Sequence, residues 1–515
     1  MTSPHTTAFL ARTAVAAWAT LVIGAMTWAL FAGTGAFAMR DMVVVDHPFL
    51  TYASLGLGSL PGRNVPQDAV LAIAGLVLPA TWVVRVLMVG AAAAGAFGAA
   101  RLSSLIDAPP SPVRSAARTR SAARTRSAAS AAAAITIAVA NPFVVERLLQ
   151  GHWSLVIAAW LLPLVAWLGF TRRTGWLIVA VWACSLTPTG ALAAVATALA
   201  THRRWQVWVA AVSVCAPWAV TGLLQPGTGT SSRAAVEVFA PRAEEHVGTI
   251  GALLGLGGIW NAEAVPASRE HGFALAGVAL FAVLLVAFRR IPRPLVLLAA
   301  AGFAVALTAW FAPGVLGWVV ETIPGAGLLR DSQKWLILAI PAYVAAAGAL
   351  PRLLAIAAIV LTVLQTPDTP TELGVLRPIA VELPRGVAEE AGTGFVLFVD
   401  RPTLIERADG IPVVDPATKA MNVIETGSLS VDGQIIDPPA NLPAGSPIRP
   451  NLIVYPDGTV EHTGAPAPPT PWLGLILLGV WAATPLLALP ARARGSGASR
   501  SRPARSQPVG KDTGR

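Results

Sequence analysis

Residues 153–173 read WSLVIAAWLLPLVAWLGFTRR, an uncharged and mostly apolar run that ends in two arginines. An α-helix needs about 20 apolar residues to cross the roughly 30 Å hydrocarbon core of a bilayer. Arginines that follow such a run favour the cytoplasmic side of the membrane. This stretch therefore predicts a transmembrane helix whose C-terminal end faces the cytoplasm.

Similar runs recur along most of the 515 residues, of which 55% are hydrophobic and only 12% charged. Soluble domains carry about 25% charged residues, so a soluble enzyme of this size is excluded. We expect an all-α polytopic membrane protein with about 10–12 transmembrane helices. The candidate segments are 13–36, 82–104, 128–140, 153–170, 175–186, 190–201, 205–224, 272–288, 294–312, 335–350, 353–366 and 472–490.

Clusters of basic residues follow every second segment, which predicts a plasma-membrane protein with both termini in the cytoplasm. On this topology all but two of the 27 acidic residues lie outside, the exceptions being Asp107 and Asp512. The net charge of +10 therefore reflects membrane orientation, and we expect no nucleic-acid partner. The A-x-A sequence at 36–38 leaves a cleaved signal peptide as an alternative, but the first apolar run is long and favours a signal anchor.

Three stretches depart from this pattern. Two short apolar runs within 175–201 are interpreted as two spans or as one re-entrant hairpin. The run at 67–80 is interpreted as an outer-surface or re-entrant helix. The repeat RSAARTRSAARTRSAAS (114–130) predicts a disordered cytoplasmic loop, with contact to anionic lipid as the alternative.

Residues 367–470 have the turn chemistry of a small β-rich domain, which the topology places outside the cell. NLIVYPDGTVEHT (451–463) and LSVDGQII (429–436) predict hairpins, and GFVLFVD (394–400) predicts a strand. The expected domains are thus a transmembrane domain (1–366), the extracytoplasmic β-rich domain (367–470), a last transmembrane helix (471–491) and a basic, disordered cytoplasmic tail (492–515).

Candidate functional residues lie in the predicted outer loops. The first outer loop, 37–81, begins with Arg40, Asp41, Asp46 and His47. A carboxylate at the bilayer surface can remove a proton from a hydroxyl group, and a neighbouring arginine can bind a phosphate. The alternative is that these residues simply cap helices at the interface.

Further candidates for substrate or phosphate binding lie in later outer loops. They are Glu146, Arg147 and His152 in the second loop, and Arg330 and Lys334 shortly before the segment at 335. No nucleotide-binding or zinc-hydrolase motif is present. No cluster has convincing metal-ligand spacing, because the contiguous Glu244, Glu245 and His246 point in different directions.

Five strings resemble actinobacterial multi-pass proteins of the GT-C glycosyltransferase superfamily. The resemblance runs from residue 10 to about 366. The strings are RDMVVVDHP (40–48), NVPQDAV (64–70), NPFVVERLLQGHW (141–153), GGIWNAEAVPASR (257–269) and LLRDSQKW (328–335).

The resemblance implies an enzyme that takes a sugar from a polyprenyl-phosphate donor at the outer membrane face. Its acceptor would be an envelope glycan or glycolipid. It implies a carboxylate base in the first outer loop, which is Asp41 here, with Asp46 as second choice. The resemblance does not identify a cofactor, and it leaves open the use of a divalent cation, Mg²⁺ or Mn²⁺. Two rival hypotheses are a lipid-sugar flippase and a non-catalytic assembly protein that acts through residues 367–470.

Overall fold

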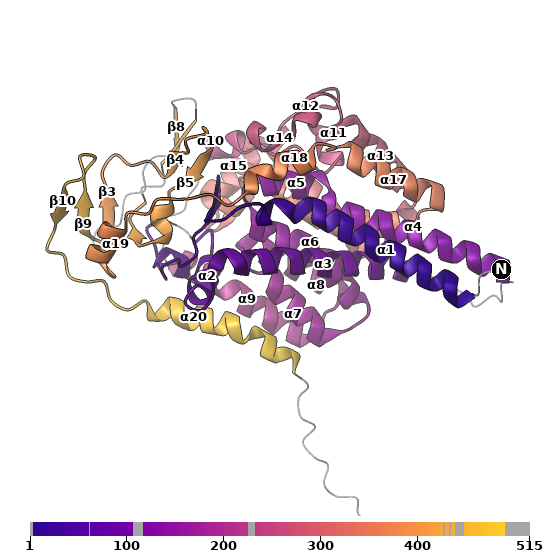
Figure 1. Cartoon of the computed structure of the whole chain (residues 1–515), viewed down its shortest axis with the longest axis horizontal. Coiled ribbons are helices and arrows are strands. Elements are labelled where there is room, and N and C mark those ends of the chain that lie inside the picture. Colours follow the sequence, from indigo (N-terminus) through magenta and orange to yellow (C-terminus); the bar gives the residue numbers. More distant parts are fainter. Residues whose placement is uncertain are drawn as a thin grey trace, which may run out of the picture.

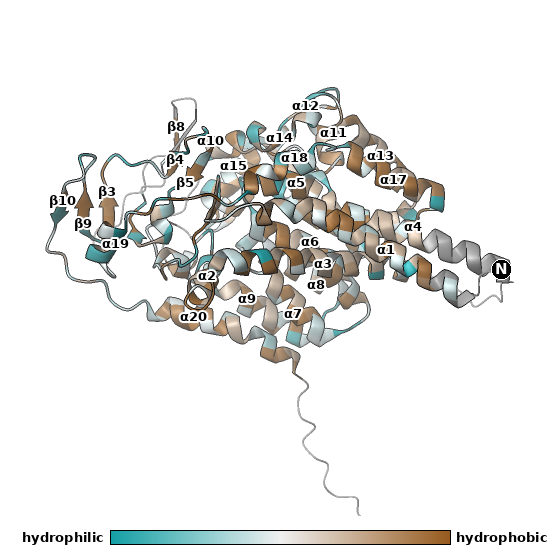
Figure 2. Ribbon diagram, in the orientation of Figure 1, coloured by the Kyte–Doolittle hydropathy of each residue, from teal (hydrophilic) through white to brown (hydrophobic). Residues whose placement is uncertain are grey.

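The computed structural model describes residues 4–60, 62–106, 117–224, 232–425, 428–431, 434–437 and 448–489. Most of these residues are helical. The strands gather at one end of the long axis of the molecule, and the N-terminus lies at the other end (Figure 1). Figure 2 shows long helices that are mainly apolar, whereas hydrophilic residues gather on α19 (Arg385–Ala391), on β10 (Val460–His462) and around α12 (Ala267–Glu270).

The described residues contain seven helices that are long and apolar enough to cross a membrane, which is consistent with a polytopic membrane protein. The predicted number of spans is reached only if at least three of four shorter apolar helices also cross. The long spans are Phe9–Phe31, Ala80–Ile106, Ala128–Leu149, Trp153–Phe170, Trp205–Leu224, Arg293–Phe311 and Arg352–Leu376, and the shorter helices are Thr174–Cys184, Pro188–Thr201, Leu275–Leu285 and Trp472–Ala488.

Helices α3 (Ala80–Ile106) and α6 (Trp153–Phe170) pack tightly at the centre of the bundle. A Cβ added at Gly98 would lie only 2.5 Å from the Leu164 backbone, so the glycine permits the close approach. Small residues have this role between membrane helices, where packing replaces the hydrophobic effect. Helix α4 (Ala117–Ala140) contacts α1 (Pro4–Thr27), α3, α16 (Ile340–Gly348) and α17 (Arg352–Leu364).

The prediction that 114–130 is a disordered loop is wrong for residues 117–130, which form the first part of α4. Residues 114–116 lie outside the described residues. Alanine and arginine are among the best helix formers, and the segment continues directly into an apolar helix. Low sequence complexity was therefore a poor guide to structure here.

The shorter apolar segments fold as separate helices. Residues 175–201 form α7 (Thr174–Cys184) and α8 (Pro188–Thr201), which are joined at Thr187, whose hydroxyl accepts a hydrogen bond from the Gly190 backbone N–H. The run at 67–80 forms the eight-residue helix α2 (Gln67–Ala74), about 12 Å long and too short to span.

The remaining helices connect or extend this bundle. They are α5 (Pro142–Leu149), α9 (Trp205–Leu224), α10 (Arg233–Val238), α11 (Gly248–Leu254), α13 (Leu275–Leu285), α14 (Arg293–Phe311), α15 (Pro313–Thr322), α18 (Thr369–Glu372), α20 (Trp472–Ala483) and the 3-10 helices η6 (Ser332–Ala339), η7 (Leu373–Leu376) and η8 (Pro416–Lys419). Because α18 and η7 extend the helical path that begins with α17, the β region begins after residue 376.

The described strands of the β region form one four-stranded sheet and two hairpins. The sheet has the order β10–β9–β3–β6, in which β3 (Phe395–Phe398) runs parallel to β9 (Pro450–Val454) and to β6 (Asn422–Val423). The hairpins are β4 (Leu404–Glu406) with β5 (Pro412–Val414), and β7 (Leu429–Val431) with β8 (Gln434–Asp437). The predicted strand at 394–400 and both predicted hairpins, β7–β8 and β9–β10, are confirmed.

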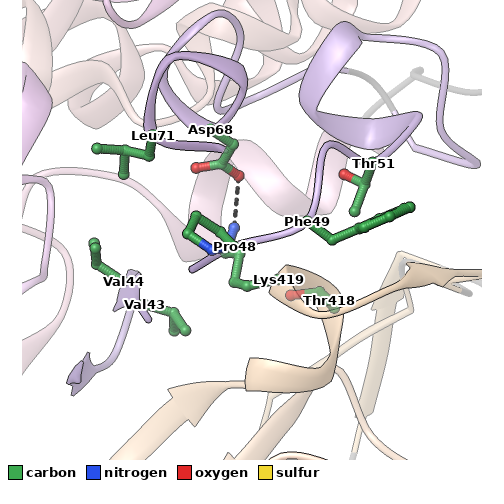
Figure 3. Close-up of a pocket in the computed structure, with 9 residues that line it drawn as sticks. All are labelled: Val43, Val44, Pro48, Phe49, Thr51, Asp68, Leu71, Thr418 and Lys419. Carbon is green, nitrogen blue, oxygen red and sulfur yellow. Dashed lines mark hydrogen bonds and ion pairs between the residues drawn. The ribbon is translucent and has the colours of Figure 1, made fainter. Parts of the chain in front are cut away.

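The β region packs directly on the first outer loop, which contains an unpredicted hairpin of β1 (Phe37–Met39) and β2 (Met42–Val44). Ala38 and Val43 share a small apolar cluster with Val413. The Lys419 ammonium also binds the Asp68 carboxylate at 2.6 Å, beside a small cavity between the loop and η8 (Figure 3). The two parts of the chain therefore form one structure at this end of the molecule.

Candidate functional site

The site begins at the two-residue turn that joins β1 to β2, where Arg40 and Asp41 lie between the paired residues Met39 and Met42. Arg40 has a φ of 45°, a conformation that normally favours glycine. Strand β5 holds this turn, because the Arg40 N–H donates to Pro412 O at 2.9 Å and Arg40 O accepts from the Val414 N–H at 3.0 Å.

The guanidinium group of Arg40 is bound by the protein. Its Nη1 donates to Leu149 O at 2.5 Å and its Nη2 donates to Glu263 O at 2.8 Å. With a residue exposure of only 9%, Arg40 acts as a link between three loops. The structure thus places this predicted phosphate ligand where it stabilises the turn.

Gly151 supports the turn from the other side. Its φ is +88°, and an added Cβ would lie 2.9 Å from the Asp41 nitrogen and closer still to the Met42 nitrogen. The neighbouring Gln150 O accepts a hydrogen bond from the Asp41 N–H at 3.2 Å. Only a glycine therefore allows the loop after α5 to lie against the turn.

Two side chains bind the Asp41 carboxylate through the same oxygen, Oδ2. The Gln150 amide donates at 2.8 Å, and His152 Nε2 lies at 3.1 Å. The Asp41 side chain is 42% exposed, and Oδ1 has no partner among the described residues. Partial burial alone would raise the pKa of Asp41, but His152 and Gln150 lower it below its ordinary value. Asp41 is thus a carboxylate with one fixed and one available oxygen.

Arg147 is linked to this carboxylate through His152 and is fully buried. It forms a two-pronged ion pair with Asp331, with Nη1–Oδ2 and Nη2–Oδ1 distances of 2.5 and 2.9 Å. It also donates to Gln333, and its Nη1 lies 3.2 Å from His152 Nδ1. Burial alone would raise the pKa of Asp331, but Arg147 lowers it to about 2. Arg147 is therefore a buried support with no guanidinium face open to a ligand.

Glu146 belongs to a deeper layer. Its carboxylate accepts hydrogen bonds from the backbone N–H groups of Gly258 and Ile259 at 3.2 and 3.0 Å. Arg269 approaches it at 3.6 Å and is paired mainly with Glu244. Because Glu146 and Arg269 are both almost fully inaccessible, the structure gives Glu146 a supporting position rather than a ligand-binding one.

Three further cations lie near the carboxylates of this site: Arg63 acts on Asp41, Lys334 acts on Asp331, and Arg330 acts on Lys334. Lys334 has no hydrogen bond or ion pair among the described residues, and Arg330 lies over the Phe239 ring at 4.6 Å. Burial lowers the pKa of Lys334 to about 8, and Arg147, Arg330 and Arg63 add to this effect while Asp331 opposes it. The arrangement offers positive charge to an anion close to the carboxylate.

Asp46 and His47 lie apart from this cluster. The Asp46 carboxylate accepts a 2.6 Å hydrogen bond from the Thr81 hydroxyl, and its backbone oxygen accepts from the Ala80 N–H at the start of α3. His47 Nδ1 lies 2.7 Å from Gly75 O, at the end of α2. Both residues thus connect the first outer loop to neighbouring helices.

Four of the five strings that suggested a family meet at this site, although up to about 290 residues separate them. The structure brings together Asp41, Arg147, His152 and Asp331, with Arg40 in the same turn as Asp41. The sequence analysis did not select Asp331 and Gln333, although they lie between Arg330 and Lys334 in the sequence. It also missed Arg63, for which no sequence pattern gives a signal.

Comparison of the chain with protein-family models, with curated proteins and with solved structures finds no match. Among the described residues, no group of three or more histidine, cysteine or acidic side chains is placed to hold a metal ion. The chemistry of the site must therefore be argued from the side chains themselves.

Proposed function

We propose that the protein is a membrane glycosyltransferase of GT-C type. It would transfer a sugar from a polyprenyl-phosphate donor to a glycan or glycolipid acceptor of the cell envelope, at the outer face of the plasma membrane. The observation that carries the proposal is the half-exposed Asp41, held through one oxygen and close to Arg63, which also lies near Lys334. A fixed carboxylate beside cations suits a reaction that removes a proton and releases a phosphate.

In this reaction the acceptor hydroxyl attacks the anomeric carbon of the donor. Asp41 Oδ1 takes the hydroxyl proton as the new glycosidic bond forms. The bond from the sugar to the phosphate breaks, and the polyprenyl phosphate leaves with the bonding electrons. Lys334 stabilises its charge, whereas the guanidinium groups of Arg40 and Arg147 are bound to protein partners.

Asp41→Asn tests this role in full-length protein reconstituted in vesicles. The amide cannot accept the proton, so transfer of labelled sugar from polyprenyl phosphate should fall at least about 100-fold. Asp46→Asn is the matched control and should reduce transfer far less, because Asp46 stabilises the start of α3.

Equal transfer by Asp41→Asn and wild type would reject the proposal. Movement of the labelled lipid across the bilayer without transfer would instead support the flippase hypothesis.

A further inference from the structure

The imidazole of His152 bridges two charged groups. Its Nε2 lies 3.1 Å from Asp41 Oδ2, and its Nδ1 lies 3.2 Å from Arg147 Nη1. A guanidinium group donates hydrogen bonds and accepts none. Nδ1 must therefore accept from Arg147, which leaves the single ring proton of the neutral form on Nε2, directed at Asp41.

Arg147 cannot easily turn away to admit a second ring proton. It is fully buried, and Asp331 and Gln333 bind its two Nη groups. An imidazolium ion would direct an Nδ1–H at a guanidinium N–H. The carboxylates of Asp41 and Asp331 favour a positive charge on the imidazole. The cations Arg147, Arg63 and Lys334 disfavour that charge. In addition, the hydrogen bond from Arg147 requires the lone pair of Nδ1, which a protonated ring does not have.

We propose that His152 is a positioning residue for Asp41 that works as a neutral imidazole, with the hydrogen on Nε2 and with its tautomer fixed by Arg147. This inference rests on the proposed function only for its effect on transfer. His152 does not take the substrate proton. It holds Oδ2, together with Gln150, so that Oδ1 remains free to accept that proton.

The tautomer can be measured directly. Full-length protein in detergent micelles would carry ¹⁵N-labelled histidine, and the His152 resonances would be identified by their loss in His152→Gln. We expect the chemical shifts of a neutral imidazole that carries its hydrogen on Nε2. Exposed His271 provides an internal comparison. An Nδ1–H tautomer, or an imidazolium at pH 7, would overturn the inference.

The effect on transfer is a second, separate measurement. The side-chain amide introduced by His152→Gln can donate from nearly the same position as Nε2, whereas His152→Phe removes the donor. Since a hydrogen bond to a charged group is lost, we expect His152→Phe to lower kcat at least about tenfold with little change in KM, and His152→Gln to restore most of the loss.

Equal loss in both variants, or no loss in His152→Phe, would contradict the positioning role. If transfer is insensitive to Asp41→Asn, the proposed function fails while the NMR result still decides the state of His152.

Discussion

At the scale of single residues, the site depends on backbone conformations that side chains rarely adopt. Arg40 has a positive φ without being glycine, and Gly151 lies where any Cβ would meet the backbone of the Asp41 turn. Such conformations cost about 1–3 kcal/mol each and persist only where surrounding contacts fix them. Here β5, Leu149 and Glu263 supply those contacts.

Gly151→Ala should therefore separate the loop after α5 from the turn. We expect a loss of about 1–3 kcal/mol in the free energy of unfolding, and a fall in sugar transfer because Gln150 and His152 move away from Asp41. Gly90→Ala is the matched control, since an added Cβ there meets no atom within 4 Å. Denaturation in micelles and the transfer assay would measure both effects. Identical behaviour of the two variants would disprove the close approach.

Lys334 offers a test by pH. Its folded-state pKa of about 8 lies below the ordinary 10.5, so protonation of Lys334 opposes folding. This penalty is complete below about pH 8 and disappears as the pH rises towards 10.5. Acylation of the amine, followed by mass spectrometry, should reach half of its maximal rate near pH 8. Lys334→Met removes the signal, and a midpoint above pH 10 would contradict the predicted environment.

At the scale of secondary-structure elements, the sequence predicted the hairpins whose turns are determined by their own residues. The DG pairs in 429–436 and 451–463 identified their hairpins, because Asp-Gly suits a tight turn. The β1–β2 hairpin was missed because its Arg40–Asp41 turn lacks the glycine of the usual two-residue hairpin signal, and distant β5 holds the turn. The sequence analysis did not predict the ion pair between Arg147 and Asp331, because no local pattern links two residues that lie 184 positions apart.

The contact between α2 and η8 can be tested through Lys419. Lys419→Met should break its 2.6 Å ion pair with Asp68 and cost about 1.5–3 kcal/mol, because both side chains are mostly buried. We expect faster hydrogen exchange in the first outer loop and in 412–419. Asp457→Asn, on the exposed β9–β10 turn, is the control. Arg407→Met would not serve as a control, because Arg407 also donates a hydrogen bond to Ala38 O in the same loop. Unchanged exchange in Lys419→Met would show that the apolar contacts alone hold the two parts together.

At the scale of the whole molecule, composition predicted a polytopic helical protein, and the structure agrees with this class. The predicted sidedness remains a prediction, because helix length and composition do not orient the chain. The N-terminus and the strands lie at opposite ends of the long axis of the molecule (Figure 1).

A reporter at Gly410 tests the sidedness. This glycine lies in the β4–β5 turn, where an insertion should be tolerated. We expect a phosphatase fusion there to be active outside the cell, and the same fusion at the N-terminus to be inactive. A cytosolic location for Gly410 would place the Asp41 site on the wrong side for the proposed reaction.

The contact between the 37–81 loop and the β4–β5 hairpin also determines when the Asp41 turn can fold during translation. Arg407 donates to Ala38 O across 369 residues, so the Asp41 turn waits for most of the polypeptide to leave the ribosome. At about 5–20 residues per second, this delay is roughly 20–70 s. A nascent chain interrupted before β5 would insert its early helices yet lack the strand that shapes the turn. The Asp41 site would thus form late, after the early helices have been inserted.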